Sequence, residues 1–132
     1  MYLARPALVV DCSVLSAVLF EESMRDEALA RLAGRTLHAP TLIEHEIASV
    51  AMKKLAQGWP VESVQAALAD YESQALELHR TNVVAQVKLA QRYKLSTYDA
   101  AYLWLAAELK APLATFDAKL GKAAQRHLGE LE

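Results

Sequence analysis

Short apolar runs alternate with longer segments of helical spacing along the chain. The clearest run is "ALVV" at residues 7–10, which is continuously apolar and partly β-branched, as in a strand buried on both faces of a sheet. The predicted strands are 7–10, 36–39, 75–79 and 113–115. The apolar residues between them recur at helical intervals and predict helices at 13–20, 22–32, 41–57, 60–72, 82–93, 97–110 and from about Ala118 onward. This alternation is typical of an α/β fold in which helices cover a parallel sheet.

The segment "LSTYDAAYLWLA", from Leu95 to Ala106, is unusual because its helix is apolar on nearly every side. Such a helix is expected to pack against several neighbours at once. We therefore expect Tyr98, Tyr102 and Trp104 to belong to the core. The same segment carries an acid, Asp99, near its start, and this position needs an explanation.

Composition sets limits on the protein's class. The chain has 132 residues, of which 54% are hydrophobic and 23% are charged. This predicts a single globular domain over residues 1–132. The 14 Lys and Arg residues against 16 Asp and Glu give a net charge of −2, which argues against a protein that coats nucleic acid through a basic surface. An enzyme whose acids hold metal ions remains compatible with this balance.

Cysteine and histidine content narrows the possible sites. Cys12 is the single cysteine, so an internal disulfide is excluded and a cytoplasmic location is expected. Residues 7–20 resemble the apolar part of a signal peptide, but Asp11 interrupts them, and no uncharged apolar stretch of membrane-spanning length exists. The four histidines show no metal-ligand spacing along the chain, so no zinc site is expected.

Three acids fall where a parallel α/β sheet presents its ligand site, beyond the carboxyl ends of its strands. Asp11 directly follows the first strand, Asp117 comes two residues after the fourth, and Asp99 lies in the first turn of the apolar helix. Each has an ordinary explanation when taken alone. Asp11 and Asp117 suit helix N-caps, and Ser96-x-x-Asp99 resembles a capping box.

The conjunction of the three acids changes this interpretation. Two unit charges about 4 Å apart repel by roughly 4 kcal/mol at an effective dielectric constant near 20. Several such pairs would consume much of a typical stability of about 5–15 kcal/mol. The acids are therefore farther apart, partly protonated, or bridged by cations. An all-carboxylate set suits Mg²⁺ or Mn²⁺ better than zinc.

Four blocks of the sequence together resemble the PIN-domain nucleases, especially the VapC-type toxins of toxin–antitoxin pairs. The blocks are "VVDCSVL", "APTLIEHEIA", "LSTYDAAYLWLA" and "ATFDAKL", and they span essentially the whole chain in the family's order. The resemblance implies a PIN-like parallel sheet of four or five strands flanked by helices. It also implies a metal-dependent endoribonuclease that leaves 5′-phosphate and 3′-hydroxyl ends, a small antitoxin partner and a homodimer.

The resemblance also implies a fourth acid, on the helix that follows the second strand. Glu44 and Glu46 are both candidates, and helical geometry does not choose between them. The family pattern, Pro-x-Leu followed by three further residues and then Glu, falls on Glu46. The family also places hydroxyls beside its acids, at positions that correspond to Ser13 and Thr115.

The resemblance, combined with the chemistry of carboxylates, suggests a role for each acid. Asp11 and Asp99 are expected to bind the principal Mg²⁺ or Mn²⁺ ion. Asp117 would bind a second ion or act through water, and Glu46 would complete the site or accept a proton from the attacking water. Basic residues are available for substrate phosphates: Lys53, Lys54, Arg80, Lys88, Arg92, Lys119 and Lys122.

Other classes fit the sequence less well. A haloacid-dehalogenase-like phosphatase needs a second Asp two residues after the first, where this chain has Ser13. A receiver-type signalling domain needs a phospho-acceptor after its third strand, where this chain has His79 and Arg80. A catalytically inactive α/β interaction module, whose acids only cap helices, and a PIN-domain nuclease of RNA processing remain as alternatives.

Overall fold

Four parallel strands form the centre of the protein in the computed structural model, which describes residues 5–130. The sheet order is β3-β2-β1-β4. The strands are β1 (Ala7–Val10), β2 (Thr36–Pro40), β3 (Glu77–His79) and β4 (Leu113–Ala114). The helices are α1 (Cys12–Leu19), α2 (Arg25–Leu32), α3 (Leu42–Ala56), α4 (Val61–Ser73), α5 (Val83–Tyr93), α6 (Thr97–Leu109) and α7 (Ala118–Glu130). The predicted α/β fold with a four-stranded parallel sheet is confirmed.

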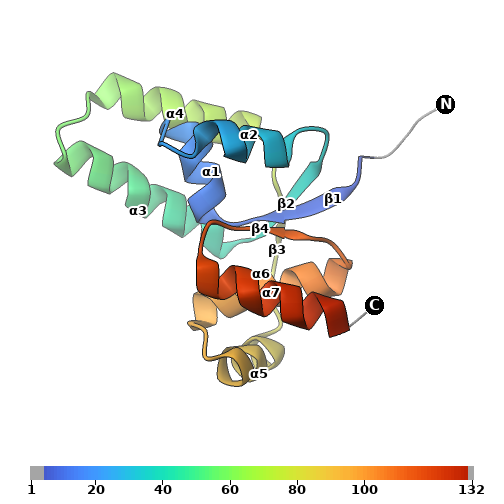
Figure 1. Ribbon diagram of the computed structural model, residues 1–132. Helices are drawn as coiled ribbons and strands as arrows, with labels where there is room; N and C mark the ends of the chain where they lie inside the picture. The colour runs from blue at the N-terminus through green and yellow to red at the C-terminus, as the bar shows by residue number, and fades with distance from the viewer. Residues whose placement is uncertain (1–4, 131–132) are drawn as a thin grey trace.

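Helices cover the sheet from two sides (Figure 1). Helices α1 to α4 lie on one side, and α5 to α7 lie on the other. None of the helices within residues 5–130 combines the length and the apolar character needed to cross a membrane.

Helix α6 and strand β1 form the middle of the core. Val9 and Val10 are fully buried in β1, and Leu103 is fully buried in α6. The expectation that α6 packs on several sides is confirmed by its contacts with β1, β2, β4, α5 and α7. The expectation that Tyr98 belongs to the core is wrong: Tyr98 is 65% exposed, because it precedes the buried stretch of α6, which begins at Ala100. Tyr102, within that stretch, is buried.

The register of the sheet brings two chain segments together at one edge. Val10 of β1 pairs with Ala114 of β4, and the Asp11 backbone N–H donates to the Ala114 carbonyl oxygen at 3.1 Å. Asp11 and Thr115 are thus adjacent, although 104 residues separate them along the chain. This edge is the carboxyl end of the sheet, where ligand sites of parallel sheets lie.

Candidate active site

Asp11 is the most tightly held acid of the site. Its Oδ1 accepts hydrogen bonds from the Val14 backbone N–H at 3.1 Å and from the Ser13 hydroxyl at 2.6 Å, and its Oδ2 accepts from the Thr115 hydroxyl at 2.5 Å. The residue is only 6% exposed. Burial raises the pKa of the Asp11 carboxyl above its ordinary value, although these hydrogen bonds act in the opposite direction.

The hydroxyls of Ser13 and Thr115 join Asp11 to the loop between β4 and α7. While each donates to Asp11, Ser13 Oγ accepts from the Phe116 backbone N–H and Thr115 Oγ1 accepts from that of Asp117, both at 3.0 Å. Both hydroxyls expected beside the acids therefore contact the Asp11 carboxylate. Together they fix its rotation and tie the position of Asp117 to it.

Arg31 of α2 supports the same loop from outside. Its Nη1 donates to the Thr115 carbonyl oxygen at 3.1 Å, and its guanidinium lies 5.1 Å from the centre of the Phe116 ring. Glu27, one helical turn earlier, accepts from Arg31 Nη2 at 2.9 Å and orients the guanidinium. The sequence offered no signal for this arginine, because its contact lies 84 residues away along the chain.

Glu46, and not Glu44, faces the other acids. The buried Tyr102 hydroxyl of α6 donates to Glu46 Oε1 at 2.5 Å. Burial raises the pKa of Glu46, and the negative charges of Asp11 and Asp99 raise it further. Glu44 turns instead toward α4, where its Oε2 accepts from the Tyr71 hydroxyl at 3.1 Å.

Asp99 lies half-buried in the first turn of α6, whose N-cap is Ser96. The Ser96 hydroxyl accepts from the Asp99 backbone N–H at 3.0 Å, as the capping interpretation predicted. Burial is the main cause of the raised pKa of the Asp99 carboxyl, and repulsion from Asp117 and Asp11 raises this pKa further. The positive charge of Lys119 partly offsets both effects. Asp117 and Asp11, which come from two other segments of the chain, therefore lie near enough to Asp99 for their charges to act on it.

Asp117 is exposed at the start of α7. Its Oδ1 accepts from the Leu120 backbone N–H at 2.8 Å, so it caps this helix. Its second oxygen, Oδ2, accepts no hydrogen bond from any group of residues 5–130. Capping therefore occupies one Asp117 oxygen and leaves the other available to a ligand.

Asp11, Glu46, Asp99 and Asp117 lie near enough for their charges to act on one another, and the four are called the acidic cluster below. The potential metal-binding atoms of these residues are all oxygens. Burial raises the pKa of Asp11, and burial together with neighbouring negative charges raises the pKa of Glu46 and Asp99. Uncompensated charge of this kind is stabilised by a hard divalent cation, for which carboxylate oxygens are the preferred ligands. The donor set fits Mg²⁺ or Mn²⁺.

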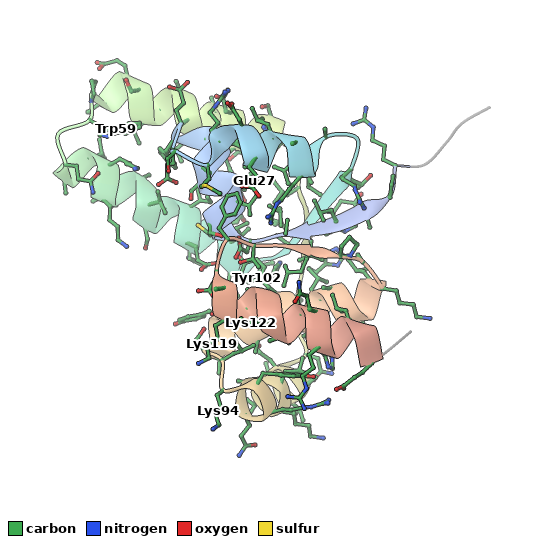
Figure 2. The ribbon with its side chains drawn as sticks, in the orientation of Figure 1. Glu27, Trp59, Lys94, Tyr102, Lys119 and Lys122 are labelled. Atoms are coloured by element: carbon green, nitrogen blue, oxygen red, sulfur yellow. The ribbon has the colours of Figure 1, made fainter. Side chains whose placement is uncertain are left out.

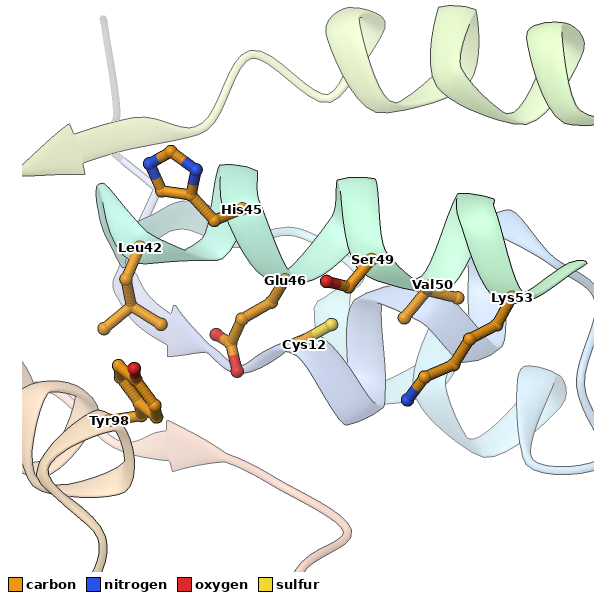
Figure 3. Close-up of a pocket in the computed structure, with 8 residues that line it drawn as sticks. All are labelled: Cys12, Leu42, His45, Glu46, Ser49, Val50, Lys53 and Tyr98. Carbon is orange, nitrogen blue, oxygen red and sulfur yellow. The ribbon is translucent and has the colours of Figure 1, made fainter.

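A cavity of about 500 Å³ opens beside the acidic cluster (Figure 3). Glu46, Lys53 and the exposed Tyr98 line it, together with Cys12. Burial and the nearby carboxylates raise the pKa of the Cys12 thiol to about 12, so it is a neutral apolar wall of this cavity. Tyr98 and Lys53 thus supply an aromatic face and a positive charge in the same cavity as Glu46.

Not all the basic candidates are free to meet a substrate. Lys54 lies 3.7 Å from Glu22, and Arg92 is paired with Glu130. Lys119 and Lys122 lie on α7 (Figure 2), and Lys119 is close enough to lower the pKa of Asp99. Lys53 lines the cavity with Glu46 and the charge of Lys119 acts on Asp99, so both lysines lie near the acidic cluster.

Comparison with known proteins decides the family. The model of the PIN domain matches residues 8–125, which include all four acids. The chain belongs to the PIN-domain family. Two similar proteins are VapC ribonuclease Mb0985 from Mycobacterium bovis and ribonuclease VapC9 from Mycobacterium tuberculosis. Each is 32% identical over 120 residues, which cover 89% of this PIN domain and 91% of the relative.

A solved structure supports the fold of this PIN domain. The crystal structure of PAE2754 from Pyrobaculum aerophilum superimposes with a TM-score of 0.71, covering 96% of this chain and 89% of that chain. Sequence identity is 19%, so the similarity concerns the fold alone. The resemblance to VapC-type PIN domains that the sequence motifs suggested is confirmed by the family match and the two relatives.

Proposed function

We propose that this PIN domain is a metal-dependent endoribonuclease and the toxin component of a toxin–antitoxin pair. The observation that carries the proposal is the convergence of Asp11, Glu46, Asp99 and Asp117 at the carboxyl end of the sheet. The relatives named VapC ribonuclease support RNA as the substrate and an antitoxin as the partner.

Each acid would have a different role, set by its surroundings. Asp11 and Asp99 would hold the principal Mg²⁺ or Mn²⁺ ion, and Asp117 would use its free oxygen for a second ion or a water. Such a cation supplies charge neutralisation at the phosphate and lowers the pKa of a water. Ser13 and Thr115 would keep the Asp11 oxygens in a fixed orientation.

Glu46 is suited to accept a proton from the attacking water. A general base works best when its pKa is near the working pH, and burial with neighbouring negative charges raises the pKa of Glu46 in that direction. The Tyr102 hydroxyl occupies one Glu46 oxygen and leaves the other for the proton.

The surroundings of the acids suit a nucleotide chain. Lys53 and Lys119 would contact its phosphates, and Tyr98 would stack on a base at the cavity of Figure 3. A toxin of this kind would act in the cytoplasm, form a homodimer, and be encoded beside a small antitoxin with a DNA-binding pattern.

Purified protein should cleave total cellular RNA with Mg²⁺ or Mn²⁺ and should lose this activity in excess chelator. Asp11→Asn should reduce cleavage by about a thousandfold or more, because several kcal/mol of cation-based stabilisation would be lost. The measurement is the rate of appearance of new RNA ends by gel electrophoresis. Asp26→Asn, an exposed acid on α2, is the matched control and should cleave like the parent. Equal cleavage by the parent and Asp11→Asn would rule out the proposed site.

A further inference from the structure

Three potential metal ligands meet on the other half of the sheet, on strands β2 and β3. His38 pairs in register with Glu77, and His79 follows two residues later on β3. Residues two apart along a strand point to the same face, so all three side chains share one face of the sheet. Their ligand atoms lie within 4.8 Å of one another. Spacing along the chain gave no sign of this group, because strand pairing joins His38 and His79, which are 41 positions apart.

A single nitrogen atom is the meeting point of this cluster. His38 Nδ1 lies 2.8 Å from His79 Nε2 and 3.5 Å from Glu77 Oε2. The 2.8 Å contact is a hydrogen bond when one of the two facing nitrogens carries a proton. When both histidines carry their protons on the outer ring nitrogens, the two facing nitrogens and the Glu77 oxygen present lone pairs to one point, as the ligands of a cation do.

Two of the three separations lie near those between neighbouring ligands of a zinc ion. Zinc binds imidazole nitrogen at about 2.0–2.1 Å and carboxylate oxygen at about 2.0–2.2 Å, so neighbouring ligand atoms of a tetrahedral site are about 3.3 Å apart. The distances of 2.8 and 3.5 Å from His38 Nδ1 bracket this value. His38 is only 8% exposed and provides a fixed anchor, while the half-buried His79 and the exposed Glu77 leave a path for the ion and room for water as fourth ligand.

We propose that His38, Glu77 and His79 form a site for Zn²⁺ that is separate from the acidic cluster. The two sites differ in chemistry, since imidazole nitrogens favour zinc and an all-oxygen set favours Mg²⁺ or Mn²⁺. The zinc ion would fasten the short edge strand β3, which has only three residues, to its neighbour β2. This role is structural and does not depend on the proposed nuclease function.

Zinc titration of the metal-free protein by isothermal calorimetry, with excess Mg²⁺ present to occupy the acidic cluster, tests the proposal. The parent should bind one Zn²⁺ per chain, and Zn²⁺ should raise its Tm. His79→Gln and Glu77→Gln should each weaken binding by more than about tenfold, because each removes a direct ligand. Both residues reach the surface, so these variants spare the buried His38.

Two controls separate this site from the rest of the protein. His127→Gln replaces a half-buried histidine that pairs with Tyr93 on the α5–α7 side, and it should bind zinc like the parent. Asp99→Asn, in the acidic cluster, should also leave zinc binding unchanged. Absence of zinc binding by the parent, or an unchanged affinity in His79→Gln, would overturn the proposal; lost binding in Asp99→Asn would do the same by assigning the zinc to the acidic cluster.

Discussion

Glu46→Gln should lower the rate of RNA cleavage by about a hundredfold or more, whereas Glu44→Gln should leave it within about twofold of the parent. Loss of a general base typically costs about 10²–10⁴ in rate. The two glutamates lie two residues apart on α3, but Tyr102 holds Glu46 beside Asp11 and Asp99, and Tyr71 holds Glu44 toward α4. The measurement is the single-turnover cleavage rate of the same RNA by the three proteins.

This pair of variants controls for helix propensity and charge. Both substitutions remove one negative charge from the same helix, and glutamine retains a side-chain oxygen that can accept the tyrosine hydroxyl. Thermal unfolding of each variant confirms that folding is intact. A slow Glu44→Gln beside a fast Glu46→Gln would reverse the assignment of the helix-borne acid.

Asp99→Asn should lower cleavage by about a thousandfold and at the same time raise the thermal stability of the metal-free protein. The pKa of Asp99 is raised by burial and by repulsion from Asp117 and Asp11, so its charge opposes folding when no cation is bound. Asp99 is half-exposed, and solvent screening limits the gain to about 1 kcal/mol, or about 3–5 °C in Tm. The measurement is the Tm in chelator, with and without Mn²⁺.

The pH dependence of stability provides a second readout for the same charge. A carboxyl whose pKa is higher in the folded than in the unfolded state binds its proton preferentially when folded, so the free energy of unfolding falls as the pH rises through that interval. Metal-free parent should therefore become more stable as the pH drops from neutral toward the raised pKa values of Asp11, Glu46 and Asp99. Asp99→Asn should flatten this rise, and Asp26→Asn should not. An Asp99→Asn protein less stable than the parent in chelator would contradict the repulsion.

Much of the fold was predictable from local patterns. The continuous apolar run of β1 and the nearly uniform apolar surface of α6 predicted the two central elements. The weaker strand signal at 75–79 corresponds to the short, exposed edge strand β3, which has little apolar surface to bury. Periodicity reports burial, so it is least informative where an element lies at the surface.

The candidate site was only partly predictable, and the residues show why. Asp11 and Asp117 follow strands whose carboxyl ends share one edge, so their proximity could be expected from topology. The choice between Glu44 and Glu46 depends on Tyr102 and Tyr71, which lie on other helices and leave no trace in local spacing.

Contacts between distant parts of the chain account for the features that the sequence did not predict. The His38–His79 contact depends on the pairing of β2 with β3, and the contact of Arg31 with Thr115 depends on how α2 lies over the β4–α7 loop. Tyr98 is exposed because it precedes the buried stretch of α6, which begins at Ala100. Helix capping, by contrast, was predictable and is compatible with ligand binding, because Asp117 uses one oxygen for its cap and keeps the other free.

Anomalous diffraction at the manganese absorption edge, from crystals grown with Mn²⁺, would locate a cation bound by the acidic cluster. We expect an anomalous peak for a Mn²⁺ ion that is coordinated by the Asp11 and Asp99 carboxylates and flanked by Glu46 and Asp117. Crystals of Asp11→Asn should lack this peak. A parent crystal with saturating Mn²⁺ and no anomalous peak within coordination distance of these acids would contradict the claim that they form a cation site.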